Sequence, residues 1–241
     1  MRFLAGLFAP VAALAAALLP GAALAQMQTV PDAATGRAAP ASPTDPQNIL
    51  LLDLSTGGRV TIWLRPDVAP KMVERIRTLT RQHFYDGLTF HRVIDGFMAQ
   101  GGGPKGDGTG GSPLPNVKAE FNYLPHVRGA VSAARADDPN SANSQFFIVF
   151  QPKLNLDKKY TVFGRVLDGM QYVDAVERGE PPANPSRILH AYVLADNPPA
   201  YQPAPPVVAQ PVTPAVLPTG PAVAAPKPAP AKTPVRRRAR R

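Results

Sequence analysis

The sequence predicts a mainly β domain, a closed barrel of short strands whose ends are covered by two helices. Between about residues 47 and 197, short apolar or β-branched runs alternate with glycine-containing turns, which is the pattern of successive strands. Only two segments are predicted to be helices. Closure removes exposed strand edges, so many short strands in one unit of about 150 residues favour a barrel.

The first two predicted strands form a hairpin, and the first helix follows them. An apolar run over residues 49–54 is followed by a Gly-Gly pair, which is a hairpin turn signal, and by the β-branched run 60–64. Asp67 is placed to cap a helix that has Pro70 in its first turn. The residues of the packed helix face recur every three or four positions: Val73, Ile76, Leu79 and His83.

The rest of the domain is predicted to consist mostly of strands. They span residues 88–94, 97–101, 130–134, 145–150, 161–166 and 188–194, with a second short helix over 169–178. An Asp-Gly turn joins the first two of these strands. Because side chains alternate along a strand, Met98 and Gln100 are expected to share a face. Phe90 and Arg92 are likewise expected to share a face of the partner strand.

Familiar site motifs are absent or stand in the wrong context. Residues 106–111 match G-x-G-x-x-G, but Pro113 and Pro115 prevent the helix that a dinucleotide site requires, so this segment is predicted to be a flexible loop. The four His share no metal-ligand spacing. The chain has no Cys, which excludes disulfides, a Cys nucleophile and Cys-ligated metals. We therefore expect neither a metal nor a cofactor.

Three segments of the domain combine apolar side chains with polar donors. They span residues 90–102, 143–148 and 156–164. In the first segment, a tight turn holds Arg, Phe, Met and Gln side chains close together. Apolar groups beside fixed donors, with no evident nucleophile, are typical of a binding groove rather than of an acid–base site.

Each of these segments contains a long motif. The motifs are F-H-R-V-I-x-G-F-M-x-Q-G-G from Phe90, S-Q-F-F-I from Ser144 and V-F-G-R-V from Val162. In this order they resemble the cyclophilin family of peptidyl-prolyl cis-trans isomerases, over a stretch from about Ile49 to Ala195. The resemblance implies an eight-stranded antiparallel barrel capped by two helices. It also implies an enzyme that accelerates rotation about X-Pro bonds in unfolded or exported polypeptides.

The resemblance implies roles for ten residues. Arg92 corresponds to the catalytic arginine, whose guanidinium favours the twisted imide over either planar isomer. The substrate-binding residues are Phe97, Met98, Gln100, Ala134, Arg135, Gln145, Phe147, Leu156 and Tyr160. Two alternatives stay open, namely Arg92 in a surface ion pair and Gln145 in a structural hydrogen bond. Asn155 stands where the family has an aromatic residue, so low sensitivity to cyclosporin is expected. The alternative function is a non-catalytic peptide-binding or chaperone module on the same fold.

The first 25 residues are predicted to be an export signal. Arg2 precedes an apolar stretch over residues 3–19, and the triplet Ala-Leu-Ala that ends at Ala25 supplies a small-x-small cleavage site. Cleavage after Ala25 predicts an exported protein, most simply a periplasmic one. The alternative is an uncleaved membrane anchor. Residues 26–46, with four Pro and five Ala, are predicted to be a linker.

Most of the excess of basic over acidic residues lies in the last part of the chain. Residues 198–241 hold 13 of the 30 Pro and seven Lys or Arg without an acidic residue, whereas the other residues carry 19 basic and 17 acidic side chains. A Pro-rich segment of this kind is predicted to be disordered. Its final Arg cluster either tethers the protein to an anionic envelope surface or forms a solvated tail. The nearly neutral domain argues against nucleic-acid binding, and we expect a monomer.

Overall fold

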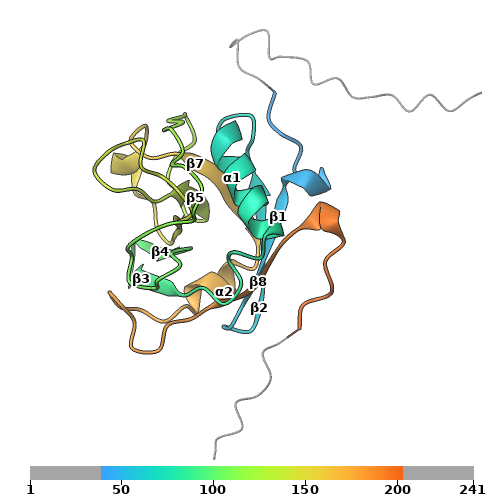
Figure 1. Cartoon of the computed structure of the whole chain (residues 1–241), viewed down its shortest axis with the longest axis vertical. Coiled ribbons are helices and arrows are strands. Elements are labelled where there is room, and N and C mark those ends of the chain that lie inside the picture. The colour runs from blue at the N-terminus through green and yellow to red at the C-terminus, as the bar shows by residue number, and fades with distance from the viewer. Residues whose placement is uncertain (1–38, 203–241) are drawn as a thin grey trace, which may run out of the picture. The chain divides into compact units, whose positions relative to one another are not determined.

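The structure, a computed structural model, describes residues 39–202 (Figure 1). The predicted export signal, most of the predicted linker and nearly all of the Pro-rich tail lie outside the described residues. Those three interpretations, and the domain boundaries that follow from them, remain predictions. None of the helices described between residues 39 and 202 is long and apolar enough to cross a membrane.

Eight antiparallel strands form one curled sheet (Figure 1). They are β1 (Ile49–Leu54), β2 (Gly58–Leu64), β3 (Phe90–Ile94), β4 (Met98–Gly101), β5 (Ala130–Ala133), β6 (Phe146–Val149), β7 (Val162–Asp168) and β8 (Ile188–Val193). Their order across the sheet is β3-β4-β6-β5-β7-β2-β1-β8. β1 and β2 form the predicted hairpin, in which Leu54 pairs with Gly58. The prediction of a mainly β domain is confirmed. Both ends of every predicted strand lie within two residues of the observed ends.

The sheet does not close into the predicted barrel. Its two edges are β3 and β8, which are joined only near one end, by an isolated bridge between Thr89 and Arg187 and the backbone hydrogen bonds around it. The outer edge of β3 is taken instead by the segment that precedes β8. There Val93 and Gly179 exchange two backbone hydrogen bonds, of 2.8 and 2.9 Å. Because this segment satisfies the edge of β3, the strands β3 and β8 form no ladder, and the predicted closure was wrong.

Two α-helices cover the curled sheet, as predicted. α1 (Pro70–Arg81) packs against β8 and α2 (Met170–Asp174) packs against β2; Figure 1 shows them at the top and the bottom of the sheet. α1 buries the predicted apolar stripe as far as Leu79. His83 does not extend this stripe, because the helix ends before it and its side chain is exposed. α2 is shorter than predicted, since the chain after it turns toward β3.

The N-terminus of α1 is capped by a residue distant in sequence. Asp67, the predicted cap, instead accepts two hydrogen bonds from Arg65, of 2.8 and 2.6 Å. The carboxylate of Glu120 accepts the backbone N–H groups of Lys71 and Met72, at 3.0 and 2.9 Å. A negative charge is favourable at a helix N-terminus. The prediction for Asp67 was therefore wrong, because the carboxylate of Glu120 accepts the N–H groups at the helix end and Asp67 is paired with Arg65.

Buried side chains form two clusters on opposite faces of β6. Phe146 belongs to the main core, whereas Phe147 belongs to a smaller second cluster that includes Met98. On β3 the alternation of faces is interrupted by a register shift between Phe90 and Arg92. This bulge turns Phe90 into the main core while Arg92 stays on the outer face, so the expectation that they share a face was wrong. The second cluster forms the floor of the site described below.

Candidate active site

A cavity of about 120 Å³ lies over the second cluster. Its lining residues are Arg92, Phe97, Met98, Gln100, Ala134, Arg135, Phe147, Leu156 and Tyr160. These are nine of the ten residues for which the sequence predicted a role. The fold brings them together from β3, β4, β6 and the loops beside them. The tenth residue, Gln145, lines a neighbouring cavity.

Apolar side chains form the floor and one wall of this cavity. Met98 and Phe147 are at most 5% exposed, so the floor is fixed by packing. The ring of Tyr160 meets Phe147 edge to face, with the centroids 5.9 Å apart. Leu156 lies in the 3₁₀ turn Leu154–Leu156 and packs against the same cluster. The cavity is therefore a preformed apolar site with room for one small side chain.

Arg92 supplies the cationic edge of the cavity. It lies on β3 opposite Gln100 of β4, on the outer face of the sheet. Its Nε donates a hydrogen bond of 2.7 Å to Oε2 of Glu180. Arg92 thus forms the surface ion pair that was its alternative role. This ion pair with Glu180 lies beside the cavity, and 42% of the Arg92 side-chain surface remains exposed. The guanidinium is neither buried in the core nor turned away from the site.

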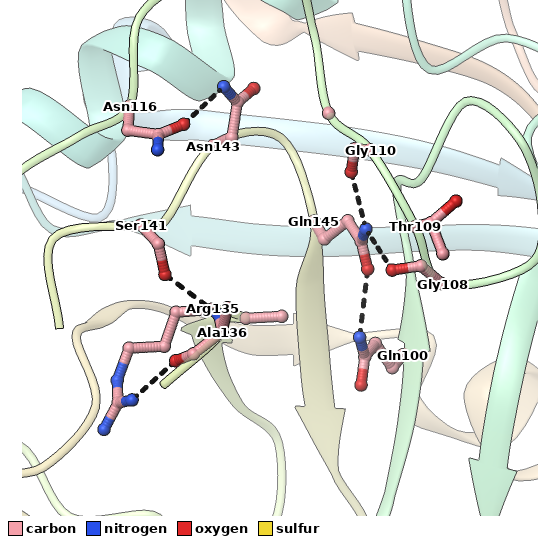
Figure 2. A pocket seen from close by; sticks show the side chains of 12 residues that line it. Gln100, Gly108, Thr109, Gly110, Asn116, Arg135, Ala136, Ser141, Asn143 and Gln145 are labelled. Carbon is pink, nitrogen blue, oxygen red and sulfur yellow. Dashed lines mark hydrogen bonds between the residues drawn. The ribbon is translucent and has the colours of Figure 1, made fainter. Parts of the chain in front are cut away.

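A chain of amides joins Gln100 to the loop that contains residues 106–111 (Figure 2). Gln100 Nε2 donates to Gln145 Oε1 at 3.0 Å, and Gln145 Nε2 donates to the carbonyl oxygens of Gly108 and Gly110 at 2.9 and 2.8 Å. Gln145 therefore makes structural hydrogen bonds, which was the alternative to a substrate-binding role. The loop opens no helix, as predicted from its prolines.

A second cavity, of about 440 Å³, adjoins the first and shares Gln100, Ala134 and Arg135 with it. Its lining includes polar side chains that the sequence analysis did not single out as binding residues. Figure 2 labels several of them, among them Thr109, Asn116, Ser141 and Asn143. They come from two loops, between β4 and β5 and between β5 and β6, so no single local pattern marks them. Together the two adjoining cavities could accommodate more than one residue of a bound peptide.

Arg135 lies at the junction of the two cavities. Its guanidinium stands 4.4 Å from the centroid of the Tyr160 ring and donates hydrogen bonds to the carbonyl oxygens of Ala136, Asp137 and Lys159. The backbone N–H and C=O of Arg135 take part in no hydrogen bond among the described residues. This leaves main-chain groups at the junction that an extended peptide could pair with.

The family model described as "Cyclophilin type peptidyl-prolyl cis-trans isomerase/CLD" matches residues 51–193. The chain belongs to this family. It is 46% identical over 172 residues to the probable peptidyl-prolyl cis-trans isomerase of Brucella suis, covering 65% of this chain and 87% of that protein. It is 43% identical over 129 residues to peptidyl-prolyl cis-trans isomerase B of Bacillus subtilis, covering 53% and 89%. This cyclophilin is therefore a peptidyl-prolyl cis-trans isomerase.

Solved cyclophilin structures have the same fold. A cyclophilin from Hirschia baltica matches with a TM-score of 0.59 and 31% identity, over 63% of this chain and 76% of that one. A cyclophilin-type isomerase from Cryptosporidium parvum, crystallised in the presence of the dipeptide Ala-Pro, matches with a TM-score of 0.57 and 26% identity, over 60% and 98%. The architecture expected from the motifs is confirmed, apart from the closure of the sheet.

Beneath the cavity of this cyclophilin lies a buried polar network that the sequence analysis missed. His126 is fully buried, with Nδ1 2.8 Å from Asp157 Oδ1 and Nε2 3.1 Å from Ser132 Oγ. Its ring stacks on Phe147 at a centroid distance of 6.1 Å. Burial lowers the pKa of His126, although its hydrogen bond to the Asp157 carboxylate opposes this shift. A neutral imidazole thus supports the floor of the cavity.

We expect the folded state to lose stability as the pH falls from about 7.5 to 5.5. Burial lowers the pKa values of both His91 and His126, so both stay neutral in the fold at pH values where the unfolded chain binds protons, near its ordinary pKa of ~6.5. The stability is therefore fully present above that value and is lost as the pH drops toward the folded pKa values. Urea unfolding at a series of pH values measures this.

The exposed histidines provide the control for this pH dependence. The side chains of His83 and His190 are 69% and 54% exposed, and each contacts Asp86. The double variant His83→Gln, His190→Gln should keep the same decrease in unfolding free energy. A wild-type unfolding free energy that stays constant between pH 7.5 and 5.5 would show that the buried imidazoles do not titrate differently from those of the unfolded chain.

Proposed function

We propose that the 120 Å³ cavity holds the proline ring of a substrate and that Arg92 is the catalytic residue. The supporting observation is that nine predicted site residues from distant parts of the chain line one preformed cavity, with the Arg92 guanidinium at its edge. The Cryptosporidium parvum relative was crystallised in the presence of the dipeptide Ala-Pro, and this chain covers 98% of the crystallised chain. Proline-containing peptides are therefore the proposed substrate class.

The reaction requires only rotation about one bond. Imide resonance gives this rotation a barrier of about 18–20 kcal/mol, and the uncatalysed reaction takes ~10–100 s. At the twisted geometry resonance is lost, and the prolyl nitrogen regains a lone pair. A guanidinium N–H of Arg92 aimed at that nitrogen donates to the twisted state and to neither planar isomer. This differential interaction lowers the barrier without a covalent intermediate.

The two cavities hold the two sides of the rotating bond differently. Phe97, Met98 and Phe147 contact the ring on the prolyl side. Polar side chains of the second cavity and the free backbone groups of Arg135 hold the residues on the other side. Because one side is fixed by packing and the other by hydrogen bonds, rotation is confined to the imide bond.

A refolding assay tests this function. The protein should accelerate the slow, proline-limited refolding phase of a disulfide-free substrate protein in proportion to its concentration. Binding of a proline peptide without any acceleration would favour the alternative, a non-catalytic peptide-binding or chaperone module. Acceleration of refolding that persists when the proline-limited phase is removed from the substrate would also favour a chaperone.

The proposed clients are exported polypeptides in the periplasm. Support comes from the sequence of the first 25 residues, which has a basic start, an apolar run and a small-x-small triplet that ends at Ala25. An isomerase that folds after export meets unfolded chains in which X-Pro bonds are still mixtures of cis and trans isomers. Catalysis of their isomerisation would then remove a slow folding step from secreted proteins.

The Arg-rich tail is proposed to tether the enzyme to an anionic surface. Each Arg near such a surface contributes about 1 kcal/mol, and salt screens this attraction. The full chain should therefore sediment with vesicles that contain anionic lipid at low salt, and less so at high salt. A variant that lacks residues 227–241 should stay in the supernatant, as should the full chain with neutral vesicles. Equal sedimentation of both forms would contradict the tether.

A further inference from the structure

The catalytic guanidinium is held by a residue that lies 88 positions away. Glu180 Oε2 accepts a hydrogen bond of 2.7 Å from Arg92 Nε, and this is the one hydrogen bond of the Arg92 side chain among the described residues. Gln100, the neighbour of Arg92 across the ladder, directs its amide to Gln145 instead. The orientation of the guanidinium plane therefore depends on Glu180.

The backbone holds Glu180 in this place. The preceding residue, Gly179, exchanges two hydrogen bonds with Val93, the residue after Arg92 on β3. Gly179 has a φ of +147°, and a Cβ at this position would come within 2.5 Å of the Cα of Pro182. Only glycine fits there, because the turn toward Pro182 that follows the pairing with Val93 leaves no room for a Cβ.

A second anchor lies on the other side of Gly179. The guanidinium of Arg178 stands 4.3 Å from the centroid of the Phe150 ring and donates a hydrogen bond of 2.7 Å to the carbonyl oxygen of Asp174. The segment that carries Glu180 is thus tied both to β3 and to the end of α2. Its carboxylate is presented by a supported backbone rather than by a free loop.

The bond to Nε leaves the other end of the guanidinium available. Arg92 lines the proline cavity and also a cavity of about 600 Å³ whose wall includes Glu180. An arginine side chain has several rotatable bonds and about 2 kcal/mol of rotamer entropy. A charge-assisted bond to Nε fixes the plane of the guanidinium, so that its two terminal nitrogens remain free to donate toward a substrate.

We propose that Glu180 is a positioning residue that aims the Arg92 guanidinium at the imide, an inference that rests on the proposed catalytic role of Arg92. Glu180 does not contact the reacting atoms. It restricts the guanidinium to the orientation in which the terminal N–H groups meet the twisted imide. Its loss should therefore lower kcat more than it raises KM, because the proline cavity itself is unchanged.

Three variants test this role by their kinetic constants. Glu180→Ala is expected to lower kcat by about three- to tenfold, the effect of one half-exposed charged hydrogen bond, with KM changed less than about twofold. Glu180→Gln should retain most of kcat, because its amide oxygen can still accept from Nε. The control is Asp196→Ala, which removes a half-exposed ion pair with Arg81 away from the site and should leave kcat unchanged.

A double variant and a spectroscopic measurement distinguish positioning from a structural effect. Glu180→Ala should cause no further loss of activity in an Arg92→Ala background, since the two residues act as one unit. The Arg92 Nε–Hε resonance should exchange faster with solvent in Glu180→Ala than in the wild type or in Glu180→Gln. Equal losses in both backgrounds, or an unchanged kcat in Glu180→Ala, would overturn the proposal.

The outcomes separate this inference from the proposed function. If Arg92→Ala abolishes most activity while Glu180→Ala does not lower kcat, the catalytic role of Arg92 stands and positioning by Glu180 is refuted. If Arg92→Ala keeps full activity, both the catalytic role and the positioning role are refuted. Urea unfolding of each variant checks that the decrease in kcat does not arise from a loss of folded protein.

Discussion

Replacing Arg92 by alanine is expected to lower kcat/KM for prolyl isomerisation by about 100- to 1,000-fold, the usual effect of removing one preorganised donor from a transition state. Of the two guanidinium groups that line the proline cavity, those of Arg92 and Arg135, only that of Arg92 has terminal nitrogens free of hydrogen bonds among the described residues. The loss should fall mainly on kcat, because the floor of the cavity is untouched. Proline-limited refolding, measured over a range of enzyme concentrations, provides the number.

Arg81 offers a closely matched control. It also bonds a carboxylate through Nε, that of Asp196 at 2.9 Å, and its side chain is 43% exposed against 42% for Arg92. Arg81→Ala should retain full activity, which shows that a half-exposed ion pair is not itself the requirement. Binding of a proline peptide to Arg92→Ala, measured by calorimetry, should survive with at most a small change. An Arg92→Ala enzyme with wild-type activity would refute the mechanism.

The strands and the first helix could be predicted because their signals are local. Alternating apolar runs, the Gly-Gly turn and the three-to-four spacing of α1 are each contained within about a dozen residues. The bulge between Phe90 and Arg92 has no such signal, since it arises from pairing with β4. The absence of a ladder between β3 and β8 likewise depends on Gly179, which pairs with Val93 from another part of the chain.

The residues of the site also fall into two groups, those that the sequence could indicate and those that depend on contacts with distant residues. Five of the nine residues that line the proline cavity lie within the long motifs, and the grouping of all nine could be expected from a family resemblance. Glu180, Glu120 and the His126 network act across separations of 31 to 88 residues. The sequence around a glutamate or a buried histidine does not indicate which distant residue will be its hydrogen-bond partner. Glu180 and the His126 network support the site and Glu120 caps α1, and only the folded chain identifies these roles.

Phe147→Ala is expected to lower the free energy of unfolding by about 3–5 kcal/mol and to lower kcat/KM by at least about tenfold. The ring is 5% exposed, forms the floor of the proline cavity and contacts both His126 and Tyr160. Its removal enlarges the cavity, so a bound proline ring would lose the packing that holds it against Arg92. Chemical unfolding and kinetics per folded molecule measure the two effects separately.

The neighbouring residue distinguishes the two effects. Phe146 is 2% exposed and points to the opposite face of β6, where its ring meets Tyr85 edge to face at 5.8 Å. Phe146→Ala should therefore lower stability by a similar amount but leave kcat/KM of the folded fraction within about twofold. If either alanine variant does not fold, Phe147→Leu and Phe146→Leu make the same comparison at lower cost in stability. Equal kinetic losses at both positions would mean that activity follows the stability of β6 rather than the shape of the proline cavity.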